Sequence, residues 1–124
     1  MVETDKKRIL VIDDEESIRN YLREILEKAG YTVMDCEDGD KGIEMFLDDD
    51  FDIVLTDIAM PKKDGVEVLI EMKKVSPSTR IIAMSGVAEC DKLLEVANIY
   101  KADATIKKPF EKEDVLSAIK KVLE

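Results

Sequence analysis

The sequence predicts an α/β domain built on a doubly wound parallel sheet. Five short apolar segments alternate along the chain with five segments of helical periodicity. The apolar segments are mostly continuous, which is typical of parallel strands that are covered by helices on both faces. Because strand–helix–strand crossovers are right-handed, successive helices are expected on both faces of such a sheet.

The predicted strands are short, and one of them differs in character from the rest. The second segment mixes polar and apolar residues and therefore fits an edge strand, whereas a purely apolar run fits a covered position. The five segments are ILVI (9–12), TVMDC (32–36), IVL (53–55), IIAM (81–84) and ATI (104–106).

The predicted helices carry apolar residues at intervals of three and four. The first stripe extends from Ile18 to Ala29, and Gly30 is expected to cap the end of this helix. The other four stripes run from Ile43 to Leu47, from Val66 to Val75, from Leu93 to Tyr100 and from Val115 to Leu123.

Length and composition exclude several classes of protein. A chain of 124 residues without repeats or linkers fits a single domain. A net charge of −10 argues against nucleic-acid binding, which needs a basic surface. No apolar run approaches the about 20 residues of a membrane span, and the first residues lack the apolar region of a secretory signal.

Two residue types bear on chemistry and location. The chain contains no histidine, so acid–base catalysis by histidine, histidine metal ligands and a phosphohistidine carrier are excluded. Cys36 and Cys90 are far apart and form no CxxC pair. Free thiols of this kind are typical of the reducing cytoplasm, where we expect the protein.

Polar side chains follow four of the predicted strands. Asp13 and Asp14 follow the first strand, Asp57 the third, Ser85 the fourth and Lys108 the fifth. Each has an ordinary explanation: the first two aspartates suit a helix start, Asp57 and Ser85 suit turns, and Lys108 suits a solvated surface. Ligands bind beyond the carboxyl ends of strands in such sheets, so the five together favour a functional site.

The charge of this edge indicates its chemistry. Adjacent carboxylates repel one another and lose hydration beside an apolar strand, so a compensating positive charge is expected. Mg²⁺, or Mn²⁺ in its place, is a hard cation that takes one or two carboxylates together with water and phosphoryl oxygens. A carboxylate nucleophile is already ionised at neutral pH and needs no histidine as general base. The pattern therefore predicts a site for metal-dependent phosphoryl transfer.

Four segments, VIDDE, LTDIAMPKKDG, AMSG and KKPF, resemble in order and spacing the motifs of the receiver domain of two-component response regulators, the CheY-like superfamily. The resemblance covers essentially the whole chain. It implies a flavodoxin-like fold with strand order 2-1-3-4-5 and five helices, as one receiver domain over residues 1–124. It also implies a phosphoacceptor in two-component or phosphorelay signalling rather than an enzyme.

The resemblance further implies how the acidic residues act. Asp57 would accept a phosphoryl group from a phosphohistidine. The Mg²⁺ ion would be bound by Asp14, by Asp57 and by the backbone carbonyl of Ala59, with Asp13 acting largely through water.

The remaining roles implied by the resemblance belong to the fourth and fifth strands. Ser85 would donate a hydrogen bond to the phosphoryl group. Lys108 would pair with the acceptor aspartate and then with a phosphoryl oxygen, aimed by a cis peptide bond before Pro109. Thr105 stands at the switch position, three residues before Lys108, where the family usually carries tyrosine or phenylalanine.

The resemblance also implies the partners. A sensor histidine kinase or a histidine phosphotransfer protein would donate the phosphoryl group. A downstream protein or a second copy of this chain would bind the surface of the fourth helix, fifth strand and fifth helix, where Leu94 and Ile99 lie outside the main apolar stripe. Neither nucleic acid nor membrane contact is expected, and the chain's end after the last helix favours a stand-alone regulator.

Two other functions are compatible with an acidic α/β domain. A Mg²⁺-dependent phosphohydrolase of the haloacid-dehalogenase type also forms an aspartyl-phosphate, but it carries a DxD motif on its first strand and a cap domain. A flavin-binding electron carrier needs a phosphate loop rich in serine, threonine and glycine after the first strand. Here that loop reads DDEES, which would repel phosphate.

Overall fold

A computed structural model describes residues 7–58, 65–86 and 102–124. The strands are β1 (Arg8–Ile12), β2 (Thr32–Cys36), β3 (Ile53–Asp57), β4 (Arg80–Ser85) and β5 (Ala104–Lys107). The helices are α1 (Glu16–Lys28), α2 (Gly39–Asp48), α3 (Gly65–Val75) and α5 (Lys112–Leu123). The helix predicted from Leu93 to Tyr100 lies outside the described residues. No described helix has the length and apolar character that a membrane span requires.

The five strands form one parallel sheet in the order β2-β1-β3-β4-β5. The predicted sheet and strand order are confirmed, and β2 is an edge strand as its mixed composition indicates. The strands extend beyond the predicted apolar runs because polar residues at their ends join the ladder. Arg80 pairs with Ile53 at one end of the sheet, and Ser85 pairs with Lys107 at the other.

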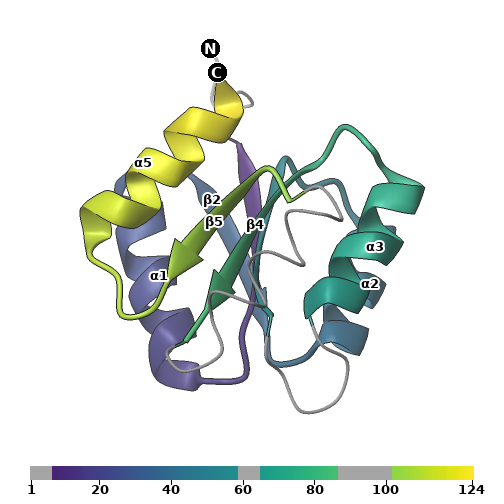
Figure 1. The fold of residues 1–124 in the computed structure, drawn as a ribbon, viewed down its shortest axis with the longest axis horizontal. Helices are drawn as coiled ribbons and strands as arrows, with labels where there is room; N and C mark the ends of the chain where they lie inside the picture. Colours follow the sequence, from purple (N-terminus) through teal and green to yellow (C-terminus); the bar gives the residue numbers. More distant parts are fainter. Residues whose placement is uncertain (1–6, 59–64, 87–101) are drawn as a thin grey trace.

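Two helical layers cover the sheet. Helices α1 and α5 lie on one face, and α2 and α3 lie on the other (Figure 1). The residues of β1 alternate between them: Ile9 and Val11 pack toward α1 and α5, whereas Leu10 and Ile12 pack toward α2 and α3. All four side chains are fully buried, which explains why this strand reads as a continuous apolar run.

The end of α1 differs by one residue from the prediction. Ala29 is the C-cap, and Gly30 follows it with a φ of 101°, a left-handed conformation that favours glycine. The N–H of Tyr31 then donates to the carbonyl of Leu26, which turns the chain toward β2. The predicted cap was therefore one position late, but the physical reason for the glycine is unchanged.

Helix α2 approaches β1 closely at a glycine. A Cβ atom built on Gly42 would lie 2.4 Å from Cδ1 and 3.0 Å from Cγ1 of Ile12, and 3.4 Å from Sγ of Cys36. Ile12 is fully buried, so its side chain has little room to move. The absence of a side chain at Gly42 therefore allows α2 to lie close to the strand that leads into the acidic site.

We expect Gly42→Ala to lower the free energy of unfolding in urea. Overpacking costs about 1–3 kcal/mol, which exceeds the gain of about 1 kcal/mol from the higher helix propensity of alanine. In an Ile12→Val background the closest clashing atom is gone, so the same substitution should be nearly neutral. An equal loss in both backgrounds would show that this contact does not set the spacing of α2 and β1.

The thiol of Cys36 should be unreactive in the native protein. Its side chain is buried, and burial raises its pKa from 9.0 to about 12. A Cys90→Ser variant should therefore react with a disulfide reagent at about pH 8 only when unfolded in urea. Because the unfolded thiol ionises near 9.0, Cys36 also removes stability as the pH rises from 9.0 toward 12. Fast labelling of the folded variant would contradict this burial.

Candidate functional site

The parallel register brings the predicted polar residues to one edge of the sheet. Because β1 pairs with β3, Asp13 after β1 lies beside Asp57 at the end of β3. Ser85 ends the neighbouring strand β4, and the N–H of Lys108 donates to the carbonyl of Ser85 at 2.7 Å. Residues from four segments distant in sequence therefore meet at the carboxyl ends of the strands, as the strand-end argument predicts.

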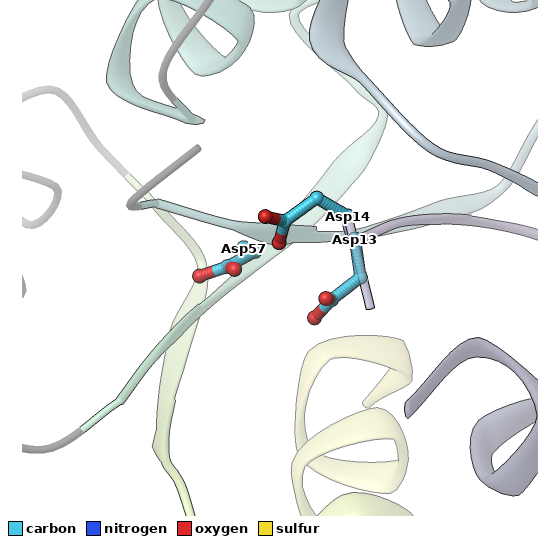
Figure 2. Close-up of side chains that lie close together, drawn as sticks. All are labelled: Asp13, Asp14 and Asp57. Carbon is cyan, nitrogen blue, oxygen red and sulfur yellow. The ribbon is translucent and has the colours of Figure 1, made fainter. Parts of the chain in front are cut away.

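The acidic residues form a compact cluster. Asp13, Asp14 and Asp57 each offer a carboxylate oxygen, and these oxygens lie within 4.8 Å of one another (Figure 2). Asp13 is fully buried and Asp57 is 4% exposed, whereas Asp14 is exposed to solvent. The cluster therefore has two carboxylates set into the protein and a third at its mouth.

Lys108 supplies the compensating positive charge. Its Nζ lies 2.8 Å from Oδ2 of Asp13 and 3.3 Å from Oδ2 of Asp57, and 3.6 Å from Oε1 of Glu15. Burial lowers the pKa of Lys108, but the hydrogen bond and charge of Asp13, together with Asp57, outweigh burial and raise it. Lys108 is therefore held as a cation. Lys108 contacts Asp57, as the resemblance implies, and lies still closer to Asp13.

Asp13 is constrained by its neighbours. Its Oδ1 accepts a hydrogen bond of 2.9 Å from the N–H of Glu15, and its Oδ2 accepts the bond from Lys108. Burial raises the pKa of Asp13, and the bonds from Lys108 and Glu15 lower it without cancelling the increase. The N-cap of α1 is Glu15, so Asp13 orders the turn before the helix and does not cap the helix itself.

Arg19 contributes to the site and was not identified from the sequence. This residue of α1 donates from Nη1 to the backbone carbonyl of Asp13 at 2.8 Å, and its Nε lies 3.7 Å from Oδ2 of Asp35 on β2. Arg23, one turn later, also pairs with Asp35 at 3.1 Å. Arg19 therefore ties the turn after β1 to the edge strand β2, and Arg23 adds a second link from α1 to that strand. Their spacing of four residues on one helix was the available signal.

The other predicted residues lie on β4 and β5 or beyond the described ranges. Ser85 is 1% exposed, and its hydroxyl lies 3.5 Å from the carbonyl of Gly86. Thr105 is half-buried on β5, in register with Ala83. The peptide bond between Lys108 and Pro109 is cis. Ala59, whose carbonyl was expected to bind metal, lies outside the described residues.

The acidic cluster fits Mg²⁺ in the kind of donors it offers. All three ligand atoms are carboxylate oxygens, which hard cations prefer, and the exposed position of Asp14 leaves an approach for ion and water. Two oxygens bound to one Mg²⁺ at about 2.1 Å lie at most about 4.2 Å apart. The spacing of up to 4.8 Å would close around an ion with a small rotation of the side chains.

Comparison with known proteins identifies the family. A model of the response regulator receiver domain matches residues 9–120. The chain belongs to this family. It is therefore a receiver of two-component signalling, a phosphoacceptor and not a classical enzyme, and the phosphohydrolase and flavin-carrier alternatives are set aside.

The similarity extends over whole relatives and over parts of longer ones. The chemotaxis protein CheY of Halobacterium salinarum is 38% identical over 117 residues, which cover 94% of this chain and 97% of that protein. The chain covers only 49% of the transcriptional regulatory protein CpxR of Escherichia coli, which is 30% identical. Receiver domains therefore occur among these relatives both alone and within proteins about twice as long.

Solved structures of receivers have the same fold. A CheY-like receiver domain protein of Methanospirillum hungatei matches with a TM-score of 0.90 at 32% identity, covering 96% of this chain and 94% of that one. The response regulator TrrA of Thermotoga maritima, solved in complex with Mg²⁺-BeF, matches with a TM-score of 0.84 at 32% identity, covering 94% and 98%. The acidic cluster thus lies in a fold for which a magnesium complex is known in a relative.

We expect Asp14→Asn to raise the melting temperature of the metal-free receiver by about 2–5 °C. Three carboxylates lie close together and Lys108 contacts two of them, Asp13 and Asp57, so removing the third negative charge at Asp14 relieves repulsion. The same change should reduce the further increase that Mg²⁺ gives to the wild type, because a charged ligand is lost.

Thermal unfolding with and without Mg²⁺ measures both effects. Glu44→Gln is a matched control, since it removes one exposed negative charge from α2 outside the acidic cluster. This control should change neither value appreciably. A metal-free Asp14→Asn variant that melts below the metal-free wild type would contradict the repulsion.

Proposed function

We propose that Asp57 accepts a phosphoryl group from a phosphohistidine of a sensor histidine kinase or a histidine phosphotransfer protein, with Mg²⁺ as cofactor. The observation that carries this proposal is the position of Asp57. Its carboxylate ends a central strand, 3.3 Å from the ammonium of Lys108 and within the acidic cluster.

The side chains around Asp57 have distinct parts in this transfer. An oxygen of the Asp57 carboxylate forms a bond to phosphorus as the bond between phosphorus and the donor imidazole nitrogen breaks. Lys108 then pairs with a phosphoryl oxygen, and the hydroxyl of Ser85 donates to another. Mg²⁺, bound by Asp14, Asp57 and the Ala59 carbonyl, with Asp13 acting through water, would neutralise the charge that gathers on the phosphoryl oxygens.

The output of the receiver would be a changed protein-binding surface. Lys108 directly follows β5, and its contacts with Asp13 and Asp57 would be redistributed when a phosphoryl group arrives. Helix α5 packs against β5 and β4, so a shift of β5 would reach the surface that it shares with α5. This surface, with the helix predicted from Leu93 to Tyr100, would bind a downstream protein or a second copy. Thr105 would take the place of the aromatic switch residue that the family usually carries. The protein would act in the cytoplasm.

We expect Asp57→Asn to abolish labelling by acetyl phosphate in Mg²⁺. The amide cannot act as a carboxylate nucleophile, and a chelator should prevent labelling of the wild type because the charge of the site is then not neutralised. Mass spectrometry of the intact chain and of its peptides measures the added phosphate and its position.

Asp50→Asn is the matched control for this experiment. It makes the same chemical change at an exposed residue just before β3, and labelling should remain at the wild-type level. Labelling of Asp57→Asn at wild-type levels, on any residue, would refute the assignment of the acceptor.

A further inference from the structure

A groove lies between the C-terminal ends of α2 and α3, at the amino-terminal ends of the strands and so at the opposite end of the sheet from the acidic cluster. A hollow of about 430 Å³ is lined by the last turn of α2, the segment leading into β3 and the segment after α3. A second hollow of about 270 Å³ lies between the two helices. Phe46, Leu47 and Val75 line both, so the hollows are neighbouring parts of one groove.

Two apolar side chains of the groove are more exposed than the other large apolar side chains of the described residues. Leu47 and Val75 are each 59% exposed, whereas the other exposed large apolar side chains in the described ranges lie between 36% and 38%. Phe46 and Met72 lie beneath them and are buried in the core. Two apolar side chains on a firmly packed floor, beside a hollow of this size, are suited to contact with another apolar surface.

The rim of the groove is acidic. Asp48, Asp49 and Asp50 are consecutive, exposed and part of the lining of the larger hollow, and Glu71 lines the smaller one. Arg8 pairs with Asp49, and Lys74 is the cation that lines the smaller hollow. Four carboxylates therefore face a groove whose lining contains one lysine.

The apolar floor and the acidic rim of the groove together indicate which kind of partner would fit it. A second copy of this chain would bring a net charge of −10 and the same acidic rim, so self-association here is opposed by repulsion. Anionic membranes and nucleic acids are opposed for the same reason. A segment with an apolar stripe between lysine or arginine side chains satisfies both features, since each charge would meet one of opposite sign.

We propose that the groove between α2 and α3 binds a positively charged amphipathic segment of another protein. The occupant's apolar residues would cover Leu47 and Val75, and its basic residues would pair with Asp48 and Asp50. The groove lies at the start of β3, whereas the acidic cluster lies at its end, so a partner can dock without blocking phosphoryl transfer. This proposal is independent of the phosphoacceptor assignment.

The test uses a displayed library of random peptides of about 16 residues, long enough for about four helical turns. The library is selected against the full chain in the presence of Mg²⁺, which would compete with basic peptides for the acidic cluster. We expect enriched peptides to carry net positive charge and apolar residues at intervals of three and four. Enrichment of neutral or acidic peptides, or no enrichment, would overturn the proposal.

Variants locate the binding of an enriched, fluorescently labelled peptide. Leu47→Ser/Val75→Ser should weaken it about tenfold or more, and Asp48→Asn/Asp50→Asn should weaken it severalfold and reduce its dependence on salt. Both pairs are exposed, so the fold should persist, which circular dichroism checks. Unchanged affinity in the Leu47→Ser/Val75→Ser variant would overturn the proposal.

Matched controls and rival occupants complete the experiment. Leu123→Ser changes an exposed apolar residue of α5, and Glu113→Gln/Glu124→Gln removes two charges elsewhere, so both should bind the peptide like the wild type. Sedimentation should show the same oligomeric state for the wild type and for the Leu47→Ser/Val75→Ser variant, because a second copy of the chain is not expected in the groove. Vesicles of anionic phospholipid should not bind either protein. Groove-dependent association or vesicle binding would refute the proposed occupant.

Discussion

The acidic edge of this receiver depends on the cation of Lys108. Two buried carboxylates at the ends of adjacent strands would repel one another in a setting of low polarity, where charges interact strongly. The ammonium of Lys108 contacts both, at 2.8 and 3.3 Å, and its own side chain is 12% exposed. Removing one partner from a buried ion pair costs about 3–5 kcal/mol because the other charge remains. The contact therefore holds together segments that are 95 residues apart.

This ion pair depends in turn on the positions of its backbone supports. Asp13 is held on one side by Arg19, which binds its carbonyl, and by the N–H of Glu15. Lys108 is held on the other side through its own N–H, which donates to the carbonyl of Ser85. A site built on strand ends in a close-packed sheet has little freedom to drift, which suits a reaction that depends on positioning.

Acidic residues are arranged differently at the two ends of the strands. At the carboxyl edge the acidic residues are gathered around a lysine, in an arrangement that a divalent cation can complete. At the opposite edge the aspartates that follow α2 are exposed beside an apolar groove. The same acidic residue type therefore forms a cluster that fits a divalent cation at one end of the strands and the rim of the proposed docking groove at the other, and the surroundings distinguish the two.

The sequence by itself determined the architecture and most of the site. Apolar runs of strand length and stripes of helical spacing identify elements because burial imposes those periods, and polar residues such as Asp57 and Ser85 stand out at the ends of runs. Tertiary structure alone decided which partners these residues meet. That Lys108 lies nearer to Asp13 than to Asp57, that Arg19 reaches the Asp13 carbonyl, and that Leu47 and Val75 share a groove are consequences of strand register and helix packing. Such contacts join residues far apart in the chain, and a local pattern carries no information on distances between them.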